Sequence, residues 1–212
     1  MKTAIIIFPG SNCDNEMERF LYKCTGIKPM MVWHKETRLP DVDLYVLPGG
    51  FSYGDYLRAG ALANLSPIMK EIKRVVKETG KKVLGICNGF QILCEAGLLP
   101  GTLRINKTQE FICKPVTICR GYDKYNIPIA HAEGNYYHPH PAEVSIAFTY
   151  AEDVNGSTGF IAGIFNNKFN VLGMMPHPER AFETYHCSTD GFKVLNDFMG
   201  ARSVVPAARP HT

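Results

Sequence analysis

The sequence KVLGICNGFQ, residues 82–91, lies near the middle of the 212-residue chain and decides how the rest is interpreted. An apolar run leads to Gly85, Cys87 stands between two glycines, and a second apolar run with helical spacing follows Gly89. This order is typical of a β-strand that turns sharply into a helix, because glycines remove side chains that would collide at the turn. A helix N-terminus beside Cys87 also favours the thiolate, the reactive form of cysteine. We therefore interpret Cys87 as a nucleophile. The alternative, a small buried apolar residue, is our interpretation of Cys24, Cys94, Cys113 and Cys119.

The first half of the chain alternates strand and helix signals. Strands are predicted at residues 4–8, 30–33, 44–47 and 83–86. Helices are predicted between the first two strands, ending at Gly26, from Ser66-Pro67 to Gly80, and from the turn at Cys87 to Gly97. Continuous apolar strands interleaved with helices indicate a parallel sheet that is covered on both faces.

The pattern changes after Pro100. Five further strands are predicted at residues 111–119, 127–130, 144–150, 159–165 and 171–175, with a last helix near Phe192, Leu195 and Met199. No repeat or linker separates the two halves. We therefore predict one α/β domain over residues 1–200, flavodoxin-like, with an open, mostly parallel sheet flanked by helices and an additional antiparallel strand region in the second half. Residues 201–212 are predicted to form a loose tail.

The composition restricts the possible partners. The formal net charge is +3, and no run of Lys or Arg is long enough to indicate nucleic-acid binding. The basic cluster at residues 70–77 contains apolar residues at helical spacing, which predicts the solvated face of an amphipathic helix. No segment approaches membrane-spanning length, and seven cysteines without an export signal indicate reduced thiols. We expect a cytoplasmic protein that binds neither nucleic acid nor membrane.

A thiol nucleophile requires a base, and the sequence MPHPER at residues 175–180 supplies one. The residue before a proline is biased toward extended backbone, so Met175 and His177 are both expected to be extended. Because an extended chain alternates sides with period two, His177 and Glu179 should share one face. We therefore predict that Glu179 orients one ring nitrogen of His177 while the other faces a thiol.

An oxyanion hole requires preorganised N–H donors. Asn88, directly after the nucleophile, offers one backbone N–H. The sequence LPGG at residues 47–50 ends a buried strand at the same edge of the predicted sheet, and its two glycines indicate a second backbone donor.

With Cys87, His177 and Glu179 in this order, the chain resembles the class I, or triad, glutamine amidotransferases. In that family a G-x-C-x-G-x-Q sequence follows a strand, and here it is GICNGFQ, residues 85–91. The resemblance implies that the cysteine attacks the side-chain amide of glutamine, releasing ammonia and forming a glutamyl thioester that water hydrolyses.

Further motifs are similar to one branch of this family, the glutaminase subunits of phosphoribosylformylglycinamidine synthases of purine biosynthesis. They are FPGSNCD (residues 8–14), GGFSYGDYLRAG (49–60), NGS (155–157), IAGI (161–164) and VLGMMPHPER (171–180). The resemblance implies that Cys87 is the nucleophile, His177 the base and Glu179 its orienting residue. It further implies oxyanion donors at Gly50 and Asn88 and contact of Gln91 with glutamine.

This likeness also implies the partners. A large synthetase subunit would bind ATP, Mg²⁺ and the ribotide, a small third subunit would assist it, and this chain would hold no cofactor. The alternatives are a glutaminase that serves another synthase, such as that for imidazole glycerol phosphate, and a catalytically silent scaffold. The loop at residues 49–60 argues against the first, and the intact triad argues against the second.

Three further features of the sequence contribute less to the prediction of function. Asn135 stands where members of the family often have arginine, which puts the contacts of that loop in doubt. The pair His138 and His140 has no obvious third ligand, so we interpret it as a surface turn and predict no metal. Cys13 lies between Asn12 and Asp14, which better suit capping of the first helix.

Overall fold

The computed structural model describes residues 1–200 of the chain, and the predicted tail lies outside them. The helices are α1 (Asp14–Thr25), α2 (Ala61–Asn64), α3 (Pro67–Glu78), α4 (Asn88–Glu95) and α5 (Gly191–Gly200). Short 3-10 turns are η1 (Ser52–Asp55), η2 (Pro141–Glu143), η3 (Thr158–Phe160) and η4 (Pro178–Arg180). The strands of the large sheet are β1 (Thr3–Ile7), β2 (Met30–Trp33), β3 (Leu44–Leu47), β4 (Lys82–Ile86), β6 (Ile112–Arg120), β7 (Asp123–His131), β9 (Ser145–Tyr150), β10 (Ile161–Phe165) and β11 (Val171–Met174).

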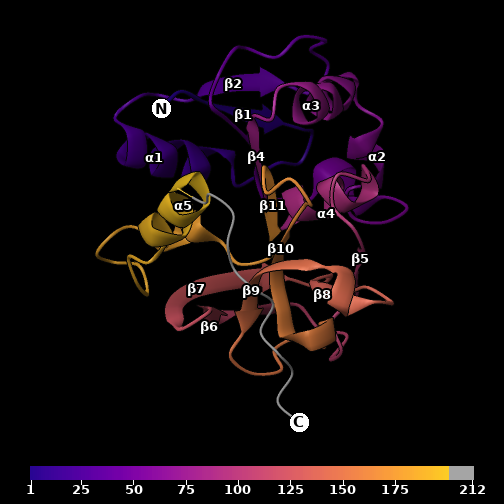
Figure 1. Ribbon diagram of the computed structural model, residues 1–212, viewed down its shortest axis with the longest axis vertical. Coiled ribbons are helices and arrows are strands. Elements are labelled where there is room, and N and C mark those ends of the chain that lie inside the picture. Colours follow the sequence, from indigo (N-terminus) through magenta and orange to yellow (C-terminus); the bar gives the residue numbers. More distant parts are fainter. Residues whose placement is uncertain (201–212) are drawn as a thin grey trace.

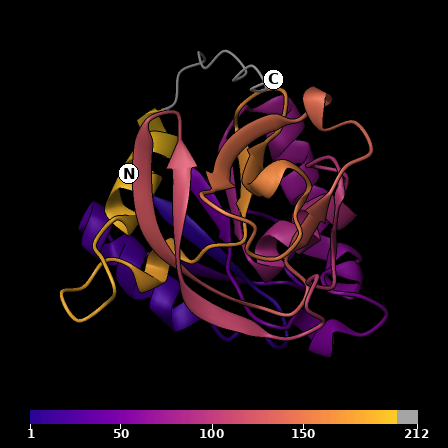
Figure 2. The same cartoon turned by 90° about the horizontal axis from the view of Figure 1, so that it is seen from below.

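These strands form one sheet in the order β2-β1-β3-β4-β11-β10-β9-β6-β7 (Figure 1). The pairs from β2 to β11 are parallel, and those from β11 to β7 are antiparallel. The predicted α/β fold is therefore confirmed, and the antiparallel strands extend the parallel part rather than forming a separate layer. In the view of Figure 2 the β6–β7 hairpin runs beside α5, which packs on β7.

The position of β11 connects the two halves of the sequence. It is the last strand along the chain, yet it lies in the middle of the sheet, parallel to β4, with Met174 opposite Ile86. The residues that follow these two strands, beginning with Met175 and Cys87, therefore leave the sheet at the same edge. This pairing brings the two predicted parts of the catalytic group together.

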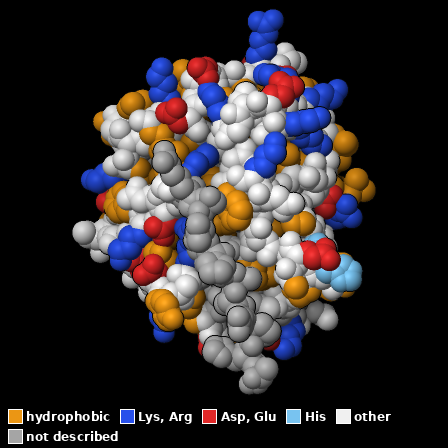
Figure 3. All heavy atoms as spheres, in the orientation of Figure 1, with side chains coloured by type: hydrophobic (Ala, Val, Ile, Leu, Met, Phe, Trp, Pro, Cys, Tyr) orange, Lys and Arg blue, Asp and Glu red, His pale blue; other side chains and the backbone are white. Residues whose placement is uncertain are grey.

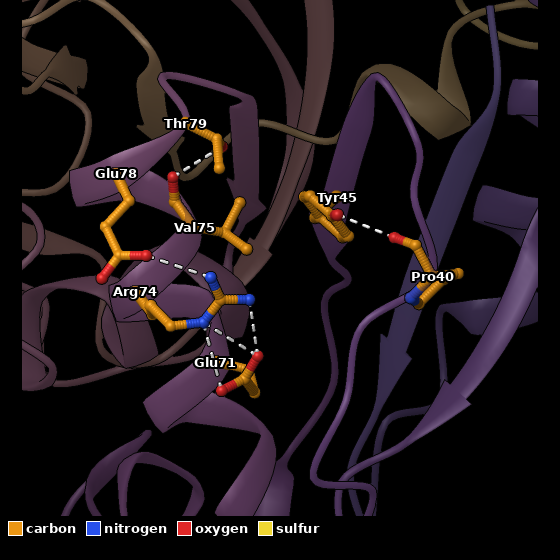
Figure 4. A network of polar contacts seen from close by, with 7 residues as sticks. All are labelled: Pro40, Tyr45, Glu71, Arg74, Val75, Glu78 and Thr79. Atoms are coloured by element: carbon orange, nitrogen blue, oxygen red, sulfur yellow. Dashed lines mark hydrogen bonds and ion pairs between the residues drawn. The ribbon is translucent and has the colours of Figure 1, made fainter.

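Helix α3 has the amphipathic character that its sequence predicts. Pro67 occupies its first turn after Ser66, and Ile68, Met69, Ile72, Val75 and Val76 are buried. On its solvent side Arg74 binds both Glu71 and Glu78 (Figure 4). The same view shows the Thr79 hydroxyl donating to the Val75 carbonyl at the end of the helix, and the Tyr45 hydroxyl donating to the Pro40 carbonyl.

Acidic and basic side chains are interspersed on the face shown in Figure 3.

Several elements differ from the sequence-based expectation, among them the four-residue helix α2, which has no counterpart among the predicted helices. A small second sheet pairs β5 (Thr102–Arg104) with β8 (Asn135–Tyr137), strands of three residues that are too short for a periodicity argument. The strand expected at 159–165 begins with the turn η3, where Gly159 has a positive φ, and becomes extended at Ile161. Among the described residues no helix is long and apolar enough to cross a membrane.

Candidate active site

The turn between β4 and α4 is as tight as its glycines indicate. Cys87 lies directly between the two elements, with φ 51° and ψ −106°, a conformation that residues with a Cβ rarely adopt. A Cβ on Gly89 would overlap the carbonyl oxygen of Leu47 in β3, and one on Gly85 would lie 2.6 Å from the carbonyl oxygen of Gly89. The Cys87 N–H donates to the Met174 carbonyl (2.8 Å), which continues the pairing of β4 with β11. The predicted strand–cysteine–helix turn is present.

His177 and Glu179 meet as predicted, but by a different backbone path. The Nδ1 of His177 lies 2.6 Å from Oε1 of Glu179, and each residue is only 1% exposed. The expectation of an extended, alternating chain is wrong for Glu179, because Pro178 starts the 3-10 turn η4. This turn brings the carboxylate back under the imidazole. The His177 N–H donates to the Pro128 carbonyl of β7 (2.8 Å), which fixes the backbone here.

The surroundings of His177 favour its charged form. Burial acts to lower its pKa, but the charges of Glu179 and Cys87 outweigh burial, and the pKa of His177 lies well above its usual value. Glu179 orients the Nδ1 edge of the ring, while Nε2 has no hydrogen-bond partner within residues 1–200. The sulfur of Cys87 lies 3.7 Å from the Ala130 carbonyl oxygen.

Most of the predicted site residues line one cavity of about 300 Å³. Its wall includes Gly50, Cys87, Gln91 and His177. Asn88 and Glu179 stand behind this wall, Asn88 at the start of α4 and Glu179 beneath His177. The structure thus brings together every residue that the sequence selected.

The LPGG segment at residues 47–50 presents a backbone donor at this cavity. The Gly50 N–H has no acceptor in the described part of the chain, whereas the next N–H, of Phe51, donates to the Gly10 carbonyl (2.9 Å). The Gly49 carbonyl accepts from the Cys13 N–H (3.3 Å), which restrains the intervening peptide. A Cβ on Gly50 would lie 2.7 Å from the Asn12 nitrogen, so a glycine is required.

The side chains of Asn88 and Gln91 form a buried network. The Asn88 carboxamide accepts from the Ser52 N–H (3.1 Å) and donates to the Gln91 oxygen (3.0 Å) and to Asp55 (3.3 Å). Gln91 in turn donates to the Glu133 carbonyl (2.8 Å). This network connects the turn at Cys87 to the loop at residues 51–60 and to the segment after β7.

His131, at the end of β7, is a residue that sequence reasoning did not select. Asn106 uses its NH₂ group to bind the carbonyls of Glu110 and His131, so its oxygen is left to accept from Nδ1 of His131 (3.0 Å). Burial, and then the charge of His177, lower the pKa of His131 to about 4. The ring is therefore neutral near pH 7. Its burial depends on tertiary contacts, and no local sequence signal predicts it.

Cys13 has a different role from the one expected. It occupies the cap position of α1, and no side chain caps that helix, so the capping assigned to Asn12 and Asp14 is wrong. Cys13 is buried, and its sulfur accepts from Nη2 of Arg180 (3.2 Å). Within residues 1–200, Cys13, His177 and Glu179 form the one group with donor atoms close enough for a metal ion, within 4.8 Å of one another. The guanidinium beside the sulfur disfavours a second cation there.

Burial and contacts test the sequence-based interpretations of the other cysteines and of the pair His138 and His140. Cys24, Cys94 and Cys119 are half-buried, but Cys113 is exposed and lines the cavity, so its interpretation as a buried apolar residue is wrong. His138 binds the backbone of His140 through Nδ1, as expected for a turn.

A strained cysteine beside a carboxylate-oriented histidine, on the edge of a parallel sheet, is the arrangement of an enzyme that forms an acyl intermediate on a thiol nucleophile. The comparison with protein families agrees. The model of the CobB/CobQ-like glutamine amidotransferase domain matches residues 1–193, and the chain belongs to this family.

Individual relatives show which members of this family the chain is similar to. The chain is 46% identical to phosphoribosylformylglycinamidine synthase subunit PurQ of Zymomonas mobilis, over 94% of this chain and 98% of the relative. It is 41% identical to a chain of the PurLQS structure from Thermotoga maritima, with a TM-score of 0.85 and coverage of 94% and 97%. At 17% identity, a glutamine amidotransferase from Thermotoga maritima shares the fold, with a TM-score of 0.61 and coverage of 93% of this chain and 81% of the other.

Proposed function

We propose that this chain is the glutaminase subunit of a phosphoribosylformylglycinamidine synthase. It hydrolyses glutamine to glutamate and ammonia and supplies the ammonia to a synthetase subunit, which converts formylglycinamide ribonucleotide to formylglycinamidine ribonucleotide with ATP. The observation that carries the proposal is the convergence of Cys87, at its strained turn, with the buried His177–Glu179 pair on one cavity. The 46% identity with the PurQ subunit supports the choice of synthase.

In the first half of the reaction the Cys87 thiolate attacks the side-chain carbonyl carbon of glutamine. Negative charge develops on the carbonyl oxygen, where the N–H groups of Gly50 and Asn88 stabilise it. The imidazolium of His177 then donates a proton from Nε2 to the amide nitrogen as the C–N bond breaks. Ammonia leaves, and a glutamyl thioester remains on Cys87. Gln91 contributes to binding of the glutamine.

In the second half His177 is neutral and acts as a base. It accepts a proton from water, whose oxygen attacks the thioester carbonyl. The C–S bond breaks, glutamate leaves, and the thiolate–imidazolium pair is restored. Glu179 keeps Nδ1 protonated and compensates the positive charge in both halves, which explains why its carboxylate is buried against the ring.

The partners and location follow from the same proposal. The large synthetase subunit binds ATP and Mg²⁺, this chain uses no cofactor, and a small third subunit completes the cytoplasmic complex. The PurLQS structure of a relative with 41% identity supports a synthetase partner.

The test compares two nitrogen sources in the complex reconstituted with its synthetase. Cys87→Ala is expected to abolish synthesis from glutamine, while synthesis from added ammonium salts persists because that step occurs on another chain. Loss of both activities would contradict this division of labour. Wild-type synthesis from glutamine in the variant would show that the chain is a silent scaffold.

A further inference from the structure

Three polar side chains meet where the loop at residues 51–60 contacts the rest of the fold. The Tyr53 hydroxyl lies 2.9 Å from Nδ1 of His34 and 3.3 Å from Oγ of Ser66. Oγ of Ser66 lies 3.1 Å from the same ring nitrogen. His34 and Ser66 are buried, and none of the three side chains lines the cavity. The reaction described above therefore does not use this cluster.

The surrounding structure favours the contact with Tyr53 over other hydrogen bonds. Ser66 holds the cap position of α3, where a serine hydroxyl commonly binds a helix N–H, yet it forms no cap hydrogen bond. His34 is fixed by its backbone, because its N–H donates to the Ile7 carbonyl (2.9 Å) and its carbonyl accepts from the Ile68 N–H (3.2 Å). Its Nε2 is buried without a partner among residues 1–200. Both side chains are thus directed toward the Tyr53 hydroxyl.

The loop that Tyr53 belongs to has a strained backbone. Tyr53, Asp55 and Leu57 have φ values of 55°, 54° and 68°, which residues with a side chain rarely adopt. Such conformations persist only where the surrounding structure enforces them. Leu57 is exposed, and the carboxylate of Asp55 receives a hydrogen bond of 3.3 Å from Asn88. The contact of Tyr53 with His34 and Ser66 therefore stabilises a loop shape that is unfavourable by itself.

The anchored residue lies next to the backbone that carries the oxyanion donors. Tyr53 comes three residues after Gly50 and directly after Ser52. The Ser52 N–H donates to Oδ1 of Asn88 (3.1 Å), and the Tyr53 N–H donates to the Pro9 carbonyl (2.7 Å). Because Tyr53 and Ser52 share a peptide bond, fixing the Tyr53 side chain also restrains the Ser52 N–H on Asn88.

We propose, on the basis of the function proposed above, that Tyr53 is a positioning residue for the glutaminase reaction and that His34 and Ser66 hold it through its hydroxyl. The anchored loop keeps Asn88 and the Gly50 peptide in the orientation in which their N–H groups meet the developing oxyanion. The effect is on the transition state rather than on binding of glutamine, because oxyanion donors act on charge that develops during the attack.

The test removes the contact from either side. Ammonia release from glutamine is measured for the full chain reconstituted with its synthetase. Tyr53→Phe removes the hydroxyl and keeps the ring. Tyr122→Phe is the matched control, because Tyr122 is fully exposed in the turn between β6 and β7. At the other end of the contact, His34→Asn keeps a hydrogen-bonding group near the position of Nδ1, whereas His34→Leu removes it.

Tyr53→Phe and His34→Leu are each expected to lower kcat by about 5- to 10-fold, the effect of one hydrogen bond. KM should stay within about twofold of the wild type, because ground-state binding is not involved. His34→Asn should retain more activity than His34→Leu. Synthesis from added ammonium salts should be unchanged in all variants, and Tyr122→Phe should behave as the wild type.

Wild-type kcat in Tyr53→Phe would overturn the proposal, and so would a loss confined to KM. Equal losses in His34→Asn and His34→Leu would overturn it too, because the ring would then act by filling space. A loss of ammonium-dependent synthesis in Tyr53→Phe would show that the hydroxyl acts on the synthetase instead. The function is tested separately: a wild-type complex that releases no ammonia from glutamine refutes the glutaminase, whereas an active wild type with an unaffected Tyr53→Phe refutes the positioning role alone.

Discussion

At the scale of single residues, the site depends on residues that the fold holds in unfavourable conformations or fixed orientations. Cys87 has a positive φ although it carries a Cβ, a conformation that costs about 1–3 kcal/mol. Gly85 and Gly89 allow the surrounding backbone to close in on this turn. The result is a sulfur fixed at the edge of the sheet, beside a histidine whose own orientation is set by Glu179.

The charge of Glu179 is the first property to test. Glu179→Gln keeps the shape of the side chain but removes the charge that raises the pKa of His177. We expect turnover of glutamine to fall by about 10²- to 10⁴-fold while the fold persists, by analogy with loss of the orienting carboxylate in other triads. Steady-state kinetics and circular dichroism measure the two effects. Wild-type turnover in the variant would exclude Glu179 from the mechanism.

Asp55 makes stability depend on pH in a definite direction. Its pKa is about 6 in the folded chain and 3.8 ordinarily, so the folded chain binds more protons between these values. Stability therefore falls as pH rises through this range. Asp55→Asn abolishes this dependence. Allowing for its solvent exposure, we expect the free energy of unfolding of the variant, relative to the wild type, to increase by about 1 kcal/mol between pH 4 and 7.

Urea titrations at several pH values measure this difference. A difference that stays constant from pH 4 to 7 would contradict the raised pKa of Asp55.

At the scale of elements, α4 packs on β3 and β4 so closely that one methyl group is too large. A Cβ on Gly89 would overlap the Leu47 carbonyl oxygen. We expect Gly89→Ala to displace α4, to lower the free energy of unfolding by about 1–3 kcal/mol and to reduce glutaminase turnover. Gly200→Ala is the control, because a Cβ there would meet nothing within 4 Å among residues 1–200 and its φ is not positive. Equal stability of the two variants would contradict the close packing.

The sequence predicts elements well where the signal is local. The parallel strands are continuous apolar runs, and the turn at Cys87 has its glycines at fixed spacing, so both were predictable. The 3-10 turn at Glu179 was not, because Pro178 is compatible with both an extended chain and a helical first turn. The contact of Cys13 with Arg180 joins residues from opposite ends of the chain, and no local pattern encodes it.

At the scale of the whole molecule, the cavity lies beside a loop suited to a partner. In the loop at residues 51–60, Tyr56 is 73% and Leu57 87% exposed, whereas Tyr53 is anchored by its hydroxyl to His34 (2.9 Å). Asn88 links this loop to the turn at Cys87. Exposed aromatic and apolar side chains favour interfaces, so docking of the synthetase here would act on the Gly49–Gly50 peptide and on Asn88.

We therefore predict that the isolated chain is a poor glutaminase. The Gly49–Gly50 peptide has no side chain to oppose its rotation and is restrained by one hydrogen bond, from the Cys13 N–H to the Gly49 carbonyl (3.3 Å). A missing oxyanion donor lowers the rate by about 10²- to 10³-fold. Steady-state hydrolysis of glutamine by the purified chain, with and without its synthetase partners, measures this effect. Equal rates would show that the Gly50 donor is already in place in the free chain.

The overall arrangement was predictable in part. Alternation of strands and helices indicated the α/β class, and the order of Cys87, His177 and Glu179 indicated the chemistry. The central position of β11 was not predictable from periodicity, because strand order depends on long-range pairing. The same holds for Asp55 and Glu133, which the fold brings to one cavity from distant segments.

The central claim is that Cys87, among the seven cysteines, is the residue that reacts with glutamine. The most direct test treats the reconstituted complex with an electrophilic chloroketone analogue of glutamine and locates the modified residue by peptide mass spectrometry. The account predicts one modification, on Cys87, that excess glutamine prevents. Modification of Cys13 or Cys113, which line the same cavity, with Cys87 left intact, would contradict it.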